Sequence, residues 1–354
     1  MKKNIPIIQI GNAKLGPGYP TFIVAEMSAN HGGSLERALD IVRSAKRAGA
    51  DAIKLQTYTA DTITLKSQRE DFCIPDNNPW AENMTLWELY DKAQTPWEWH
   101  EEIFREARNL GLEIFSSPFD PSAVEFLESL EVPAYKIASP EITDIPLLEC
   151  VARTGKPIIL STGLAELKDI HLALKTLRDA GAVDIIILKC TTSYPAPANE
   201  SNLNTIPDIA SRFNVLSGLS DHTTGTVAAI ASVCLGASVI EKHFTLDDGK
   251  KTLDSFFSLG EKEFAHLVKE VRLVEESLGK VSYEIACSAK SSLRGRRSLY
   301  VSENIKSGDR FTKSNIRSVR PSYGLHPKYY TEILGRRAKC DLHAGDRLSW
   351  NVIE

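Results

Sequence analysis

Two features are absent from this 354-residue chain, and each absence excludes a class of protein. No apolar run approaches the roughly 18 residues of a membrane span, and no long apolar stretch follows residues 1–6 as in a secretory signal. The six cysteines are scattered, with no C-x-x-C pair, which argues against a disulfide framework and against a cysteine zinc site. We therefore expect a cytoplasmic protein with reduced thiols and no membrane partner.

The chain also lacks a run of like charges, although its charge is unevenly distributed. Residues 288–354 hold 14 Lys/Arg and 6 Asp/Glu, a balance of +8, which leaves a balance of −12 on residues 1–287. A basic tail is one signature of nucleic-acid binding, but this tail has no clustered basic run. We favour a small module that docks on an acidic body, in its own chain or a partner's, and we expect no nucleic-acid partner.

Short apolar, β-prone runs recur from residue 22 onward, and most of them are followed by a helical pattern. The expected strands are 22–27, 52–57, 113–117, 134–139, 157–162, 185–191, 215–220 and 238–244. The expected helices are 34–48, 97–110, 121–130, 145–153, 167–180, 226–234 and 261–278. Eight βα units over about 260 residues predict an α/β fold of the TIM (β/α)8 barrel type, with a doubly wound open sheet as the alternative.

A second, smaller module is expected after the barrel. Residues 285–295 are rich in Ser and Ala and read as a linker, which assigns residues 1–284 to the barrel. Residues 296–354 contain an internal repeat, because Gly-Asp-Arg at 308–310 recurs at 345–347 with matching apolar positions around it. The repeat predicts a small pseudo-symmetric β module, for which docking is expected because a core of that size is marginal.

Polar side chains end nearly every expected strand, where the active sites of TIM barrels lie. His222 and His243 end neighbouring strands and could hold one divalent metal, although each also suits a hydrogen-bonded core residue or an acid–base group. His31, after the first strand, could be a third ligand or a sugar contact.

Two lysines, Lys54 and Lys136, lie near the ends of otherwise apolar strands. A buried lysine is costly unless it meets an anion, and serine hydroxyls end several of the same strands, so we favour a phosphate or carboxylate ligand. A Schiff-base lysine, as in barrel aldolases, and simple pairing with Glu26 or Glu241 are the alternatives.

The connection between the second expected strand, 52–57, and the expected helix 97–110 is unusually long, from residue 58 to residue 96. A connection of this length is usually a lid or a binding loop. A packed excursion with its own small helix, around residues 85–90, is the alternative.

Taken together, these stretches resemble the sialic acid synthase family over the whole chain. The resemblance rests on six stretches that occur in order: 25–31 (AEMSANH), 53–57 (IKLQT), 135–141 (YKIASPE), 160–163 (LSTG), 218–223 (GLSDHT) and 241–245 (EKHFT). The tail, with Arg320-Pro321 and the repeated Gly-Asp turns, is similar to the antifreeze-like (SAF) domain of these enzymes.

The resemblance implies an enzyme that condenses phosphoenolpyruvate with an amino-sugar aldehyde, giving a nine-carbon 2-keto acid and phosphate. It implies Mn²⁺, or Mg²⁺ or Co²⁺, on His222 and His243, and a homodimer in which Arg320 of a swapped C-terminal domain reaches the partner's barrel. The implied catalytic residues are Glu26, His222, Glu241 and His243. The implied phosphoenolpyruvate ligands are Lys54, Ser117, Lys136, Ser139, Ser161 and Ser220. The implied sugar contacts are Gln56, Glu141, Tyr194, Asp254 and Arg320.

Some positions depart from the pattern of the sialic acid synthases and are more similar to the pseudaminic acid synthases, a branch of the same family. Thr192 stands where Asn is expected, and Phe256 and Phe257 follow Asp254. Loss of an amide and gain of apolar rings suit a 6-deoxy 2,4-diacetamido hexose, which has fewer hydroxyl groups. A pocket that kept a partner for an absent hydroxyl group would leave its own polar groups unpaired. The expected substrate is therefore 2,4-diacetamido-2,4,6-trideoxy-altropyranose, with an N-acetylneuraminate or legionaminate synthase as the alternative. The resemblance suggests a surface glycan or flagellin as the destination of the product.

Two interpretations from other classes remain open at this stage. A barrel that binds a polymer without catalysis is disfavoured by the full set of polar strand ends. A tail that binds ice or carbohydrate is disfavoured, for ice, by its density of charge.

Overall fold

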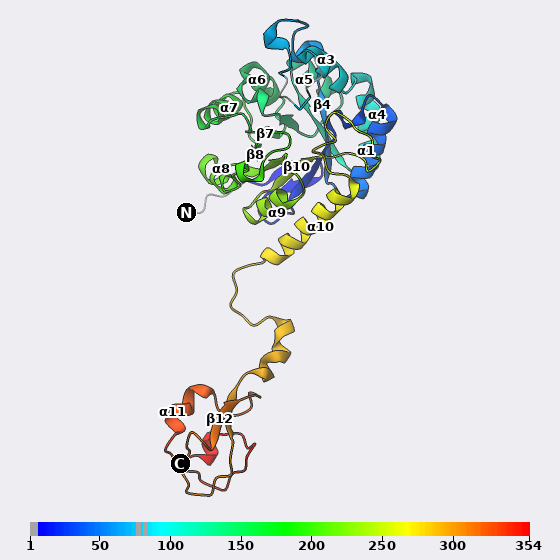
Figure 1. Cartoon of the computed structure of the whole chain (residues 1–354). Coiled ribbons are helices and arrows are strands. Elements are labelled where there is room, and N and C mark those ends of the chain that lie inside the picture. The colour runs from blue at the N-terminus through cyan, green and yellow to red at the C-terminus, as the bar shows by residue number, and fades with distance from the viewer. Residues whose placement is uncertain (1–5, 76–78, 81–83) are drawn as a thin grey trace. The chain divides into compact units, whose positions relative to one another are not determined.

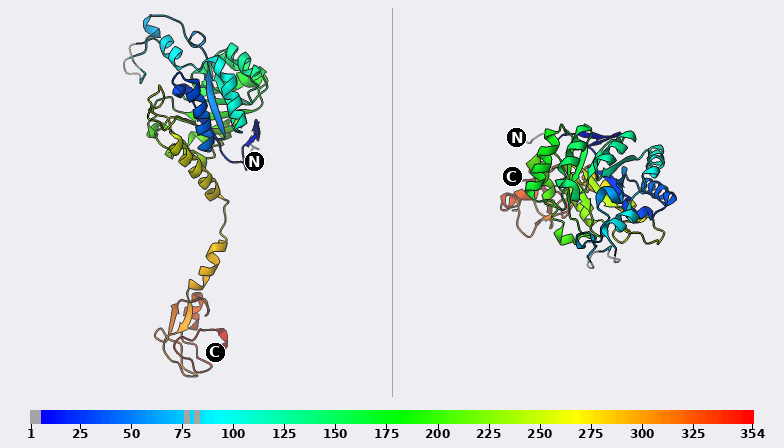
Figure 2. Two further views of the ribbon diagram at one scale, coloured as in Figure 1. Left: turned by 90° about the vertical axis from the view of Figure 1, so that its right-hand side faces the viewer. Right: turned by 90° about the horizontal axis from the view of Figure 1, so that it is seen from above.

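The structure is a computed structural model that describes residues 6–75, 79–80 and 84–354. The chain divides into two compact units, of which one ends at Gly279 and the other begins at Lys280 (Figures 1 and 2). None of the helices in the described ranges has the length and apolar content that a bilayer crossing requires. Residues 76–78 and 81–83 of the predicted lid lie outside the described residues.

The first unit is a TIM barrel. In the described part of the chain, eight parallel strands close in the order β10-β3-β4-β5-β6-β7-β8-β9. Their bounds are β3 Phe22–Glu26, β4 Ala52–Thr57, β5 Glu113–Pro118, β6 Tyr135–Ile137, β7 Ile158–Ser161, β8 Ile185–Cys190, β9 Leu216–Asp221 and β10 Val239–His243. Each overlaps an expected strand, because strands covered on both faces read as continuous apolar runs. The closed sheet excludes the open doubly wound alternative.

Helices surround the barrel and are visible as an outer ring in Figure 1. They are α1 Leu35–Arg47, α4 Trp97–Asn109, α5 Pro121–Ser129, α6 Ile145–Arg153, α7 Leu167–Asp179, α8 Thr205–Phe213, α9 Val227–Cys234 and α10 Glu261–Leu278. Helix α1 begins where predicted, because the Ser34 side chain accepts a hydrogen bond from the Arg37 amide. Helix α8 was not predicted; Pro207 lies in its first turn, the one part of a helix that tolerates proline.

A hairpin that the sequence analysis did not predict covers the opposite end of the barrel from the polar strand ends. It consists of β1 (Ile8–Ile10) and β2 (Ala13–Leu15), which pair antiparallel. Its buried side chains pack with residues that begin barrel strands, such as Phe22 and Leu216. The hairpin therefore closes the amino end of the barrel and leaves the carboxyl end for the site.

The second unit has its own apolar core and contains the predicted repeat. Strands β11 (Ser298–Val301) and β12 (Ile316–Val319) pair antiparallel. The Asp309 carboxylate accepts from the Lys306 amide at 3.0 Å, and the Asp346 carboxylate accepts from the His343 amide at 2.7 Å, so the two copies form the same turn. Residues Cys287–Gly295 of the predicted linker form a 3-10 helix.

Candidate active site

The parallel register brings the polar strand ends together around one rim. Glu241 lies beside Ser220, His243 beside Glu26, and Glu26 beside Lys54. Gly218 makes the approach of β9 and β10 possible, because a Cβ atom there would lie 2.2 Å from the carbonyl oxygen of Val239. The barrel topology therefore gathers residues that are far apart in the sequence.

A buried cluster of two lysines and two carboxylates forms at this rim. Lys54 Nζ lies 2.5 Å from Glu26 Oε2 and 3.8 Å from Glu241 Oε1, and Lys136 Nζ also lies 3.8 Å from Glu241 Oε1. Lys54 donates to Ser117 Oγ at 3.2 Å, and Ser220 Oγ donates to Glu241 at 3.2 Å. Pairing of the lysines with carboxylates, one of the sequence alternatives, is thus present, because Lys54 contacts Glu26 and both lysines approach Glu241.

The surroundings of Glu26 and Glu241 shift the pKa values of their carboxyl groups in opposite directions. Burial raises the pKa of Glu26 to about 7 against the opposing charge of Lys54. Burial acts in the same direction on Glu241, but Lys136 and Lys54 outweigh it and hold the pKa of Glu241 below its usual value. One carboxyl group can therefore carry a proton near neutral pH while its neighbour stays ionised, which is the arrangement that general acid–base chemistry needs.

Two further serines of the predicted anion site end β6 and β7. Ser139 Oγ accepts a hydrogen bond from the Gly163 amide at 2.9 Å. Ser161 is buried, and among the described residues its hydroxyl has no hydrogen-bond partner. Lys136 Nζ donates to the carbonyl of Ile137 at 3.0 Å, which leaves donor capacity on the ammonium group.

The two predicted metal ligands face each other. The ring centroids of His222 and His243 are 5.4 Å apart. Nδ1 of His222 is 2.9 Å from the carbonyl oxygen of Thr191, a contact that requires an N–H there; in the neutral imidazole Nε2 is then the lone-pair nitrogen. Burial lowers the pKa of His222, but Cys190 and the Thr191 carbonyl outweigh burial and raise it. Burial lowers the pKa of His243 well below its usual value, so its imidazole is neutral, and Nδ1 of His243 is buried without a partner in the described structure. The pair fits a divalent metal.

The remaining coordination positions would fall to substrate and water, because the described residues contain no cluster of three or more His, Cys, Asp or Glu suited to a metal. His31 is fully buried, and its ring lies 5.6 Å from the ring of Trp99 on α4. Its Nδ1 accepts a hydrogen bond from the Gly33 amide at 3.1 Å, and its Nε2 is buried without a partner among the described residues. Both interpretations of His31, as a third ligand and as a sugar contact, stay predictions.

A cavity of about 470 Å³ adjoins this rim, because it is lined by His243, the register neighbour of Glu26. Four of the predicted sugar contacts line it together with the predicted metal ligand His243; these are Gln56, Glu141, Tyr194 and Asp254. Burial raises the pKa of Glu141 to about 7, and its Oε2 is buried without a partner in the described structure. The fifth predicted sugar contact, Arg320, belongs to the C-terminal unit and is exposed there.

Asp254 is held by residues that the sequence analysis did not identify. Its Oδ2 accepts from Ser28 Oγ at 2.5 Å and from the Ala29 amide at 3.3 Å. Next to it, Asn30 donates to the Phe244 carbonyl at 3.0 Å and accepts from Thr252 Oγ1 at 2.6 Å. These bonds fasten the loop after β3 to the loop after β10. The one feature of the sequence that points to these bonds is the stretch Ser28–Asn30, which precedes His31.

The predicted pair of aromatic residues divides between two surfaces. Phe257 is buried at 4% exposure, and its ring lies 4.6 Å from His243 and 4.9 Å from Tyr194, inside the cavity. Phe256 is 48% exposed and lines a neighbouring cleft instead. The two rings lie 4.9 Å apart, and of the two it is Phe257 that lines the cavity.

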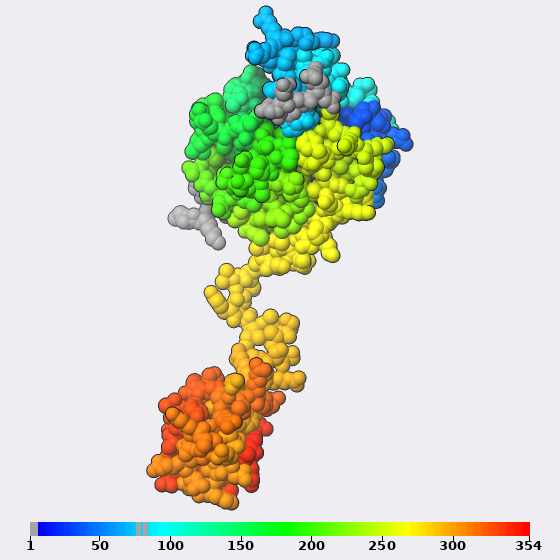
Figure 3. Space-filling view, viewed as in Figure 1, coloured from blue at the N-terminus to red at the C-terminus, as the bar shows by residue number. Residues whose placement is uncertain are grey.

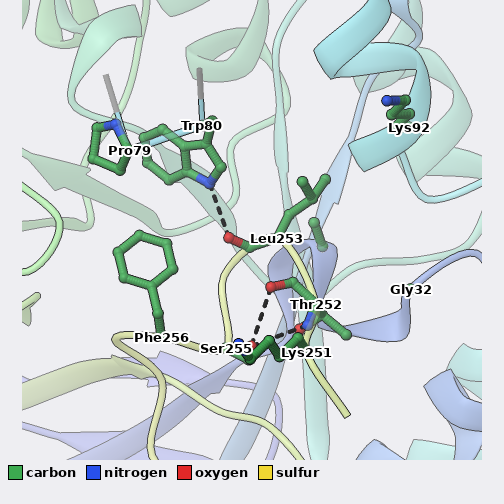
Figure 4. Close-up of a pocket in the computed structure, with 10 residues that line it drawn as sticks. Gly32, Pro79, Trp80, Lys92, Lys251, Thr252, Leu253, Ser255 and Phe256 are labelled. Carbon is green, nitrogen blue, oxygen red and sulfur yellow. Dashed lines mark hydrogen bonds between the residues drawn. The ribbon is translucent and has the colours of Figure 1, made fainter. Parts of the chain in front are cut away.

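The neighbouring cleft, of about 590 Å³, is shown in Figure 4. Trp80 and Leu253 line both this cleft and the cavity, and Trp80 Nε1 donates to the Leu253 carbonyl at 2.9 Å. The ring of Trp80 lies 6.0 Å from that of Phe256, so the loop after β10, yellow in Figure 3, reaches the long connection after β4. The polar strand ends open into the cavity rather than this cleft.

Comparison with known proteins then decides the family. A model of the NeuB family matches residues 41–283, and a model of the SAF domain matches residues 296–354. The chain belongs to the NeuB family. Pseudaminic acid synthase of Campylobacter jejuni is 46% identical over 341 residues, which are 96% of this chain and 98% of that protein. N,N'-diacetyllegionaminic acid synthase of Legionella pneumophila is 34% identical, over 96% of each chain.

A solved structure of a NeuB-type enzyme has the same fold. The N-acetylneuraminic acid synthetase of Leptospira borgpetersenii, in complex with citrate, aligns with a TM-score of 0.71 at 32% identity, over 81% of this chain and 95% of that one. The predicted α/β barrel followed by a SAF domain is thus confirmed. The chain is a member of an enzyme family that includes nonulosonic acid synthases.

Proposed function

We propose that this protein is a pseudaminic acid synthase, which condenses phosphoenolpyruvate with 2,4-diacetamido-2,4,6-trideoxy-altropyranose and water to give pseudaminic acid and phosphate. The observation that carries the proposal is the lysine–carboxylate cluster at the strand ends, next to a cavity lined by all four barrel residues expected to contact the sugar. The choice of sugar is supported by the 46% identity to a pseudaminic acid synthase, against 34% to a legionaminic acid synthase.

Lys54 and Lys136 would bind the phosphate and carboxylate of phosphoenolpyruvate. Both are almost fully buried, and the hydroxyl groups of Ser117, Ser220 and Ser161 lie at the same rim. Charge-assisted hydrogen bonds from ammonium groups to an anion are among the strongest that proteins form. The ligand would take over part of the pairing that Glu241 now provides at 3.8 Å, a distance that is already long for a hydrogen bond.

His222 and His243 would hold a divalent metal, for which Mn²⁺ is our expectation. The chemistry that such an ion supplies when bound is polarisation of the open-chain aldehyde oxygen. The neutral state of His243 and the fixed tautomer of His222 prepare both nitrogens for this role.

The two carboxyl groups then have different tasks. C3 of the enol attacks the aldehyde carbon, which forms the new C–C bond and leaves cationic character at C2; the ionised Glu241 would stabilise that charge. Water adds at C2, and one of its protons passes to the former aldehyde oxygen, which becomes a hydroxyl group. The second proton leaves with inorganic phosphate as the C2–O bond to phosphate breaks and the oxygen from water becomes the keto group. Glu26, with its pKa raised to about 7, is the group suited to hold the proton that moves in these steps.

We further propose that the enzyme works as a homodimer with exchanged C-terminal domains. The segment that begins the second unit exposes apolar side chains, with Val281 91% exposed and Tyr283 98% exposed. Solvent-exposed apolar side chains in a connecting segment suit burial against a second copy. Arg320 is the residue expected to reach the partner's cavity. A cytoplasmic location and a role in surface or flagellin glycans stay predictions.

The reaction can be tested with phosphoenolpyruvate labelled with ¹⁸O in the bridging oxygen. Incubation with Mn²⁺ and the 6-deoxy diacetamido sugar should give a nine-carbon keto acid in mass spectra, with the label in the released phosphate. A label retained in the keto acid would contradict C–O cleavage. Trapping of the protein by borohydride with pyruvate would instead indicate a Schiff-base aldolase.

A further inference from the structure

Helix α3 (Leu86–Ala93) lies in the long connection after β4 and carries an apolar stripe that no core covers. All eight of its residues are described, and none is buried. Leu86, Leu89, Tyr90 and Ala93 recur at the spacing of one helix face, and all four line the 470 Å³ cavity. An apolar stripe normally packs into a core; this one faces the substrate cavity.

The helix is anchored from its other side. The Thr85 side chain caps it by accepting from the Glu88 amide at 3.3 Å, and the Glu88 carboxylate accepts from the Thr85 amide at 2.8 Å. Trp87 Nε1 donates to Asp61 Oδ1 of α2 (Ala60–Ile63) at 2.8 Å. The capping bonds define where the helix begins, and the Trp87–Asp61 bond joins it to α2.

The stripe lies across the cavity from Tyr194. In the ring order of the described strands, β4 and β8 are four positions apart in a barrel of eight, so the connections that follow them face each other. After β8 comes Tyr194, whose ring lies 4.4 Å from His222. A sugar with its aldehyde carbon beside His222 and Tyr194 would therefore direct its far end, C4 to C6, toward α3.

We propose that the α3 stripe recognises the apolar substituents at this far end, the C6 methyl group and the methyl group of the 4-acetamido substituent. This inference rests on the proposed function. The side chains of Leu86, Leu89 and Ala93 have no hydrogen-bonding groups, so a C6 hydroxyl placed against them would lose its water without gaining a partner. The stripe would thus make Leu86 and Leu89 specificity-determining residues.

The test compares full-length wild-type protein, Leu89→Asn and the matched control Asp91→Asn. Asp91 is exposed on the same helix, and asparagine keeps the oxygen that accepts from Gln94. Each protein receives phosphoenolpyruvate, Mn²⁺ and either the 6-deoxy diacetamido sugar or its 6-hydroxy analogue, and phosphate release gives kcat and KM. We expect Leu89→Asn to reduce the preference for the 6-deoxy sugar by about tenfold, mainly through KM.

The control should retain the wild-type preference and the wild-type rate. An equal loss of kcat/KM with both sugars in Leu89→Asn would overturn the inference and assign the stripe to packing. A changed oligomeric state in size-exclusion chromatography, with an unchanged sugar preference, would overturn it in favour of a protein partner. Failure of the wild-type protein to turn over the 6-deoxy sugar would reject the proposed function itself and this inference with it.

Discussion

Replacement of Glu141 by glutamine should stabilise the ligand-free protein at alkaline pH. The carboxyl group lines the cavity, and burial raises its pKa from 4.5 to about 7. In the folded state the group therefore holds its proton more tightly than in the unfolded state. The ionised form opposes folding above pH 7, and this penalty disappears as the pH falls from 7 to 4.5. Glutamine keeps the shape of the side chain without the charge.

The size of the effect follows from the shift. The difference between 4.5 and about 7 corresponds to a folding free energy on the order of 3 kcal/mol at pH 8. For a domain of this size, that is a rise in Tm of roughly 5 °C. Below pH 4.5 the variant and the wild type should have equal stability, because the wild-type carboxyl group is then neutral in both states.

Thermal unfolding of the barrel, followed between pH 4.5 and pH 8, measures this difference. Glu101→Gln, on the exposed face of α4, is the matched control and should change Tm at no pH in this range. A gap between Glu141→Gln and wild type that is independent of pH would refute the reasoning, as would a less stable variant at pH 8.

Three other changes follow from the same structure. His243→Ala should abolish phosphate release and weaken Mn²⁺ binding in calorimetry while leaving Tm nearly unchanged; normal turnover would refute the metal assignment. Gly218→Ala should destabilise the barrel by about 1–3 kcal/mol in urea unfolding, because its Cβ meets the Val239 carbonyl at 2.2 Å, and an unchanged midpoint would contradict that contact. Arg320→Ala mixed and refolded with His243→Ala should recover about a quarter of wild-type activity if Arg320 acts in the partner's site; no recovery would reject the exchanged dimer.

The barrel was predictable because the sequence of each strand reflects its burial. Strands buried on both faces, such as Ile185–Cys190, read as uninterrupted apolar runs, and polar residues mark where they end. Helix α8 escaped prediction because Pro207 obscures its first turn, and the hairpin β1–β2 because its strands have only three residues each. Strand register, by contrast, follows from the barrel once the strands are known.

Only the part of the candidate site that lies on the strands could be predicted from the sequence. Glu26, Lys54, Glu241 and His243 lie on strands, and parallel pairing brings them together. Contacts between loops have no comparable local signal. The bond from Thr252 to Asn30 joins residues 222 positions apart, and the outward turn of Phe256 depends on the loop conformation, so neither could be read from the sequence.

Condensation of phosphoenolpyruvate with a 6-deoxy diacetamido sugar can be measured as Mn²⁺-dependent phosphate release with that sugar and, in parallel, with N-acetylmannosamine. We expect release with the diacetamido sugar and little or none with N-acetylmannosamine. Release with N-acetylmannosamine alone would contradict the proposed function and identify the protein as a sialic acid synthase.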